Sequence, residues 1–322
     1  MTSLHTLLAL CVLSAVGCCF AQSSTTSAPA KAVDPWASIA SGSTVIADAA
    51  GTNTTYHYRL IEPRAEAIAD PNARVPLVVF LHGAGERGED NRAQLTHFAG
   101  ACATEEFQRR VPCYVLAMQC PNGESWATIK QVQSDGKAHW SLPFQEEPTR
   151  PLRAVMQAMD EVIAKTKAVD PSRIYLTGLS MGGFGSFDLA ARRPELFAAV
   201  VPICGGGDPE TAARFAKLPI YIVHGSDDPV VPVGLSRAMN EAIAAAANTV
   251  WREELRRESE ATPQAPRPMP KRPPNPMYRE YDKVGHDSWT SAYRFGEDGV
   301  LDWMFAQRRP SASAATNAPT VK

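Results

Sequence analysis

Three separate stretches of the sequence carry side chains suited to acyl-transfer chemistry, and the first is centred on Ser180. It lies in Gly178-Leu-Ser-Met-Gly182, between an apolar, β-rich run, Ile174 to Thr177, and a helical stretch, Gly183 to Arg193. A serine at the apex of a sharp strand-to-helix turn presents its hydroxyl above the sheet, and the N-terminus of the helix points at it. The flanking glycines allow backbone to pass close by. This context predicts a nucleophile, whereas an ordinary loop serine or a helix N-cap is the alternative.

A carboxylate and a histidine follow Ser180 in the chain order that a catalytic triad requires. Asp227 and Asp228 come directly after an apolar run, Leu218 to His224, and either could be the acid. The other would then be a turn-forming residue. His286 lies in a loop after the last expected strand and completes the order Ser, Asp, His. We therefore expect His286 to accept the proton of Ser180 while the acid orients its imidazole ring.

A glycine-rich loop after another apolar run can be interpreted in two ways. The run Val75 to His82 is typical of a strand buried on both faces of a parallel sheet, and it is followed by Gly83, Gly85 and Gly88. These glycines match the spacing of a dinucleotide-binding loop. However, the next helix is expected only near Asn91, and the strand Cys113 to Met118 ends without an acidic residue for a ribose.

An oxyanion hole is the favoured interpretation of this loop. The backbone N–H of Ala84 or Gly85 would join that of Met181 to face a carbonyl oxygen, which supplies the part of the machinery that Ser180 lacks. His82 is then expected to be structural. Glu86 and Arg87 form a solvated ion pair, brace the loop or contact a substrate, and the sequence leaves these alternatives open.

The stretch Asn122 to Phe144 is irregular and contains Trp126 and Trp140. A loop of this length is often functional. The two tryptophans would either wall a substrate pocket or cover the core.

Other patterns predict the frame that holds these residues. They are an antiparallel hairpin, Ser43 to Ala47 and Tyr56 to Ile61, a helix from Pro148 to Val169, a strand from Leu196 to Cys204, a helix over 234–247, a strand from Met277 to Tyr281 and a closing helix from Ser288 to Ala306. The sequence therefore predicts an α/β fold with a mostly parallel central sheet, an N-terminal antiparallel hairpin and helices on both faces.

The N-terminal segment indicates export. Residues 1–21 have a short apolar core and small residues before Gln22, as in a signal peptide, and 22–42 form a linker. We therefore expect a secreted or periplasmic protein. The alternative is a lipoprotein, because the residues up to Cys18 also suit lipid attachment at that cysteine.

One catalytic domain is expected over 43–308, interrupted by a Pro-rich insertion at 261–276 and followed by a disordered tail, 309–322. The 322 residues are 44% hydrophobic and 20% charged, which suits a globular protein. The net charge of −2 without a polybasic block implies no nucleic acid partner, and no apolar stretch is long enough to span a bilayer.

The sequence implies neither a metal nor an organic cofactor. Histidines outside the triad lack metal-ligand spacing, and no phosphate-binding loop of the P-loop type occurs. Four cysteines follow the signal peptide, and free buried thiols are expected at Cys102, Cys113, Cys120 and Cys204. A Cys113–Cys120 bond would need a sharp bend, whereas Cys102–Cys113 is feasible.

Five motifs together resemble the α/β-hydrolase superfamily, and more closely the secreted bacterial esterases labelled "predicted peptidase" or phospholipase/carboxylesterase. The resemblance covers about residues 45–305, and its motifs are His82–Gly88, Gly178–Gly183, Pro202–Gly206, His224–Pro232 and Gly285–Trp289. Relatives of this group include polyhydroxybutyrate depolymerase-like, feruloyl and acetyl-xylan esterases.

The resemblance implies serine-dependent hydrolysis of carboxylic esters on one catalytic domain. It assigns the acid to Asp228, the fifth residue of H-G-x-x-D. It also suggests acetyl or feruloyl esters of plant polysaccharide as substrates. The candidate substrate contacts are Glu86, Arg87, Trp126, Trp140 and Trp289. Two alternatives remain, a serine peptidase of the prolyl-oligopeptidase type and a non-catalytic binding protein with the same fold.

Overall fold

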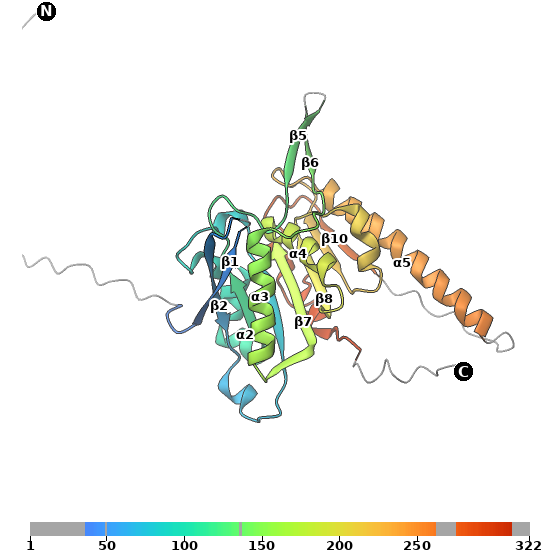
Figure 1. Ribbon diagram of the computed structural model, residues 1–322. Coiled ribbons are helices and arrows are strands. Elements are labelled where there is room, and N and C mark those ends of the chain that lie inside the picture. Colours follow the sequence, from blue (N-terminus) through green and yellow to red (C-terminus); the bar gives the residue numbers. More distant parts are fainter. Residues whose placement is uncertain (1–35, 49, 135–136, 262–274, 311–322) are drawn as a thin grey trace, which may run out of the picture. The chain divides into compact units, whose positions relative to one another are not determined.

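The computed structural model describes residues 36–48, 50–134, 137–261 and 275–310 (Figure 1). Every helix and strand of the described residues lies in one compact unit, which begins at Ser38. The expected signal peptide with Cys18, most of the linker, nearly all of the Pro-rich insertion and residues 311–322 of the tail lie outside the described residues. None of the described helices is long and apolar enough to cross a membrane.

Eight strands form one sheet in the order β1-β2-β4-β3-β7-β8-β9-β10. β2 pairs antiparallel with β1 and β4, and the other neighbours are parallel, which confirms the predicted sheet with its N-terminal hairpin. The strands are β1 (Ala40–Ala47), β2 (Asn53–Ile61), β3 (Val75–Leu81), β4 (Tyr114–Met118), β7 (Val169–Leu179), β8 (Ala199–Ile203), β9 (Tyr221–Gly225) and β10 (Met277–Tyr281).

The α-helices are α1 (Phe98–Cys102), α2 (Glu105–Arg110), α3 (Arg150–Lys165), α4 (Met181–Arg192), α5 (Gly234–Ala261), α6 (Trp289–Ala292) and α7 (Leu301–Ala306). The closing helix predicted from Ser288 to Ala306 is therefore two short helices, since Gly296 between them has a φ of +96°. The helix expected near Asn91 begins only at Phe98, because Asn91 and His97 also have positive φ.

The helix α5 is longer than the predicted 234–247. Its last turns extend beyond the sheet (Figure 1) and carry ion pairs of Glu253 with Arg257 and of Arg256 with Glu260, four residues apart. Such pairs stabilise an exposed helix by a few tenths of a kcal/mol each. These ion pairs stabilise the end of α5, where the sequence lacks the apolar periodicity that predicts a helix.

Helices cover both faces of the sheet, which explains the near-continuous apolar runs in its strands. Side chains alternate between the two faces of a strand. On β7, Ile174 and Leu176 belong to the core that includes residues of α3 and α4. Tyr175 between them packs its ring on Phe305 of α7, with 5.4 Å between ring centroids.

The strands β3 and β7 meet where the chain changes direction across the sheet. β3 pairs with β4 on one side and β7 on the other, and Leu81 lies opposite Gly178. Loops that leave adjacent strands at such a switch point diverge and leave a crevice at their carboxyl ends. The glycine-rich loop after β3 and the turn at Ser180 are therefore neighbours.

The irregular stretch expected from Asn122 to Phe144 contains a second sheet. β5 (Lys130–Ser134) pairs antiparallel with β6 (Lys137–Ser141), and Figure 1 shows the pair projecting from the eight-stranded sheet. Both strands are mostly polar, so they show little of the apolar alternation that predicts a half-buried strand. The informative sequence signal is Asp135-Gly136, a dipeptide typical of hairpin turns.

The close approach of β3 to the turn after β7 predicts the effect of a methyl group at Gly182. A Cβ there would lie 1.9 Å from the carbonyl oxygen of Leu81, so Gly182→Ala should lower the free energy of unfolding by about 3 kcal/mol. Gly234→Ala is the control, because a Cβ at Gly234 meets nothing within 4 Å. Urea denaturation measures both, and equal stabilities of the two variants would contradict the packing.

Candidate active site

Ser180 lies between β7 and α4 in a strained backbone conformation, with φ 53° and ψ −116°. A residue with a side chain adopts this conformation only where its surroundings impose it. Its N–H donates to the carbonyl oxygen of Ile203 at 2.9 Å, and a Cβ at Gly178 would lie 2.4 Å from the Gly182 oxygen. The turn is therefore fixed on both sides by backbone, as the sequence around Ser180 predicts.

The three residues predicted as a triad form a hydrogen-bonded line. The Nε2 atom of His286 lies 3.0 Å from Ser180 Oγ, and its Nδ1 lies 2.7 Å from Asp228 Oδ2. A carboxylate only accepts, so Nδ1 carries a proton and Nε2 is free to accept the proton of the serine hydroxyl. This is the relation of nucleophile, base and orienting acid in acyl-transfer enzymes.

The structure separates the two candidate acids. The side chain of Asp228 is fully buried, and its Oδ1 accepts the N–H groups of Val230 and Val231 at 2.8 and 2.9 Å. Burial raises the pKa of this carboxyl, but hydrogen bonds from His286 and the two N–H groups outweigh it and leave the pKa below the ordinary value. Asp227 is exposed and accepts from Ser226 Oγ in the turn.

The loop after β3 is held by the ring of His82. Its Nδ1 donates to the Gly83 carbonyl at 2.6 Å, its Nε2 accepts the N–H of Cys120 at 2.9 Å, and burial lowers its pKa to about 4. His82 is therefore a neutral structural residue, as expected. A short 3₁₀ helix follows directly, Ala84–Glu86, in place of the long helix of a dinucleotide-binding loop.

This clamped loop lies against the nucleophile turn. A Cβ at Gly83 would meet the side chain of Leu179 at 2.8 Å, and Ala84 is exposed at the next position. The N–H groups of Ala84 and Met181 thus come from two adjacent segments, the start of the 3₁₀ helix and the first residue of α4.

The predicted substrate-contact tryptophans have three different environments. Trp126 is fully buried and donates its indole N–H to the His82 carbonyl at 2.9 Å, so its role is to cover the core. Trp140 is partly exposed and stacks on Phe184 of α4 at 5.8 Å. Trp289 is partly exposed and packs edge-on against the His286 ring at 5.3 Å. The burial of Trp126 removes it from the candidate substrate contacts and leaves Trp140 and Trp289.

Glu86 and Arg87 are directed to different neighbours. The carboxylate of Glu86 lies 3.5 Å from Nε2 of His97, whose ring is 5.4 Å from that of Trp289. Arg87 lies beside the thiol of Cys120, whose pKa burial raises to about 12 in spite of the guanidinium charge. A series of contacts thus runs from Glu86 through His97 and Trp289 to His286. His97 has no sequence signal, because an isolated histidine 11 residues after Glu86 reveals no contact.

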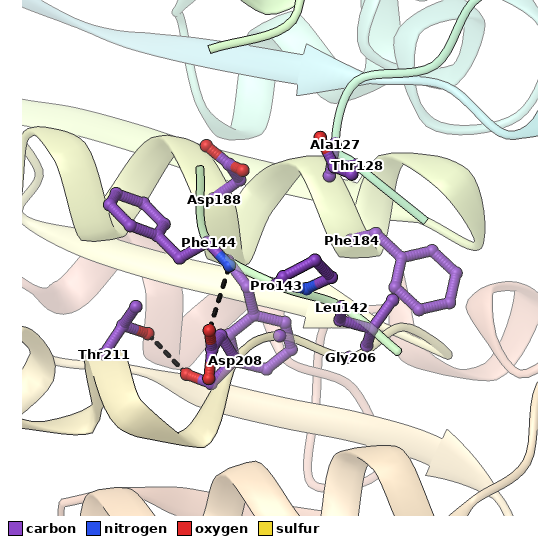
Figure 2. Close-up of a pocket in the computed structure, with 12 residues that line it drawn as sticks. Ala127, Thr128, Leu142, Pro143, Phe144, Phe184, Asp188, Gly206, Asp208 and Thr211 are labelled. Atoms are coloured by element: carbon purple, nitrogen blue, oxygen red, sulfur yellow. Dashed lines mark hydrogen bonds between the residues drawn. The ribbon is translucent and has the colours of Figure 1, made fainter. Parts of the chain in front are cut away.

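A small pocket lies along α4 (Figure 2). The α4 residues that line it lie from Phe184 to Asp188 and follow Ser180 by four to eight positions, which is one to two helical turns. Phe184 and Asp188 of α4, Leu142 and Phe144 are among its lining residues, and no triad residue is. Asp208 accepts the N–H of Phe144 at 2.9 Å and so fixes the segment that follows the hairpin (Figure 2). One helical turn is about 5.4 Å, so Phe184 is the part of this wall closest to the nucleophile along the helix.

The four cysteines of the described residues, Cys102, Cys113, Cys120 and Cys204, are free and buried, as expected. Within the described ranges, the single group of three potential metal ligands is Cys204 with Asp228 and His286. The last two are bonded to each other, so this group coincides with the triad.

The buried, neutral His82 predicts a pH dependence of stability. Its pKa is about 4 in the folded state against 6.5 in the unfolded chain, so the unfolded state binds the proton more tightly. As the pH falls from about 6.5 to 4, this group should remove up to about 3 kcal/mol from the free energy of unfolding.

His82→Asn keeps a donor near Gly83 but does not titrate. Urea denaturation at several pH values should show a less stable variant with a shallower loss of stability on acidification. Parallel losses in wild type and variant would contradict the assignment.

Known proteins that are similar to this chain include esterases. The solved structure titled "Crystal Structure of a Thermostable Esterase" is 34% identical with a TM-score of 0.64, covering 84% of this chain and 63% of that one. Poly(3-hydroxyalkanoate) depolymerase C of Paucimonas lemoignei is 29% identical over 134 residues, 42% of this chain and 28% of that protein.

The bifunctional acetylxylan esterase/xylanase XynS20E of Neocallimastix patriciarum is 27% identical over 162 residues, 50% of this chain and 20% of that protein. The chain thus spans less than two thirds of each of these three proteins. The sequence pattern of the Phospholipase/Carboxylesterase family matches residues 63–265. The chain belongs to this family of α/β-hydrolases.

Proposed function

We propose that this protein is a serine esterase that hydrolyses carboxylic esters. The observation that carries the proposal is the line from Ser180 through His286 to the buried Asp228, with the serine on a strained turn. Membership of an esterase family supports it. The intact line also argues against a binding protein that retains only the fold.

The geometry suits a two-step reaction. Ser180 Oγ attacks the ester carbonyl while His286 Nε2 accepts its proton, and Asp228 stabilises the imidazolium that forms. His286 then returns the proton to the leaving alcohol. The N–H groups of Met181 and Ala84 stabilise the oxyanion, and each such donor lowers a barrier of this kind by about 3–4 kcal/mol. Water activated by His286 hydrolyses the acyl-enzyme.

The surroundings of the triad suggest where the two halves of an ester bind. The leaving alcohol must lie near His286, which protonates it, and Trp289 packs against the His286 ring. The stacked rings of Trp140 and Phe184 lie along α4 beyond Ser180, and we assign them to the acyl side.

We further propose acetyl or feruloyl esters of plant polysaccharide as the substrates, on a single catalytic domain over 43–308. The relative named as an acetylxylan esterase/xylanase supports this class. Export through the signal peptide at 1–21, or a lipid anchor at Cys18, would bring the enzyme to such insoluble material. Peptide hydrolysis by the same triad is the second candidate.

The triad predicts a sharp contrast between neighbouring carboxylates. Ser180→Ala and Asp228→Asn should each lower kcat for p-nitrophenyl acetate by about 10⁴-fold, because the nucleophile or the tautomer that activates it is lost. Asp227→Asn is the matched control and should stay within about threefold, as an exposed residue does. Full activity of Ser180→Ala would exclude the mechanism, and a folded wild type that cleaves peptides but no ester would favour the peptidase.

The assignment of the acyl side predicts a chain-length effect. Trp140→Ala should raise KM for p-nitrophenyl octanoate by about tenfold and change that for the acetate little, because about 1–2 kcal/mol of aromatic contact is lost. The control is His139→Ala, an exposed neighbour on the same strand. An equal change in KM for both esters would contradict the assignment of Trp140 to the acyl side.

A further inference from the structure

A second buried histidine, His224, contacts the triad acid. It lies at the end of β9, four residues before Asp228, and its side chain is fully buried. Its Nε2 is 3.1 Å from Asp228 Oδ2 and 3.0 Å from the carbonyl oxygen of Val231. Both partners only accept, so Nε2 carries a proton. One oxygen of Asp228 therefore accepts N–H groups from two imidazole rings, those of His224 and His286.

The other nitrogen of His224 is bonded away from the triad. Nδ1 lies 2.7 Å from Ser236 Oγ, and this hydroxyl lies 2.9 Å from the carbonyl oxygen of Gly205. Ser236 is in the first turn of α5, and Gly205 is the second residue after β8. His224, Ser236 and Gly205 are all buried. This series of hydrogen bonds thus links Asp228 through His224 to α5 and to the segment after β8.

The surroundings of His224 act on its pKa in opposite directions. Burial lowers the pKa, whereas the bonds to Val231 and Asp228 oppose this effect. The ionisable groups that face it are Asp228, His286 and Glu280, its neighbour on β10, whose carboxylate is paired with Arg237. The Ser236 hydroxyl donates to the Gly205 carbonyl oxygen, and its oxygen faces Nδ1.

We propose that His224 is a positioning residue of the triad, which fixes the Asp228 carboxylate and withdraws part of its negative charge from His286. A carboxylate oxygen shared between two N–H donors attracts each of them less than an oxygen with one donor does. His224 would thus set the pH range in which His286 is a free base. This inference rests on the proposed esterase function.

Three variants separate this electrostatic role from packing. His224→Leu keeps a similar volume and removes the N–H. His224→Gln keeps a donor close to the position of Nε2. Ser236→Ala breaks the line behind the ring but leaves the N–H on Asp228. Each is assayed with p-nitrophenyl acetate from pH 5 to 9, and folding is checked by circular dichroism.

For His224→Leu we expect kcat about 10–100-fold lower, the value of one hydrogen bond to a charged group, with KM nearly unchanged. The acid limb of the kcat/KM profile should move up by about one pH unit, because His286 then faces the undivided charge of Asp228. His224→Gln should retain most of the wild-type kcat and keep the acid limb close to its wild-type position. Ser236→Ala should leave the acid limb unmoved. A folded His224→Leu protein with an unmoved limb would overturn the proposal.

Proton NMR tests the same inference without turnover, so a protein that hydrolyses no ester still yields a result. Two N–H groups on one carboxylate should give two low-field imidazole signals. His224→Leu should abolish one of them and shift the other. Two signals that survive this substitution unchanged would show that the rings do not share Asp228. A wild type that hydrolyses no ester, while His224→Leu still changes the imidazole signals as described, would refute only the proposed function.

Discussion

The site depends on one close approach of backbone to backbone, that of the Ser180 turn to the end of β3. No side chain fits at Gly182 or Gly178, because the Leu81 carbonyl and the turn itself occupy the space. This packing holds Ser180 in a conformation that a serine does not adopt unaided. The same approach brings the first N–H of α4 beside the loop at Ala84, so that nucleophile and candidate oxyanion donors are placed by a single contact.

A second constraint is the carboxylate of Asp228. It is buried, and it accepts two backbone N–H groups and two imidazole N–H groups. A buried charge is tolerated only when its acceptor sites are filled, and here the donors come from β9, the loop after it and the loop after β10. The acid thus connects the carboxyl end of the sheet to the loop that carries His286.

Local turn chemistry made much of this predictable from the sequence. A glycine-flanked serine between a strand and a helix has few alternative conformations, and the parallel sheet follows from continuous apolar runs. The residues alone could not choose between Asp227 and Asp228, which follow the same strand. The sequence does not reveal the strands β5 and β6, because they are polar. The core position of Trp126 follows only from its buried hydrogen bond to His82. The contact of Glu86 with His97 depends on a strained loop that no local pattern reveals.

The residue that carries the covalent bond to a trapped acyl analogue tests the proposed nucleophile most directly. A fluorophosphonate probe traps an activated serine, and peptide mass spectrometry of the labelled protein locates the adduct. We expect one adduct, on Ser180, formed rapidly by the wild type and very slowly by His286→Ala, which lacks the base. An adduct on another residue, or labelling of Ser180 at the same rate without His286, would contradict the proposed mechanism.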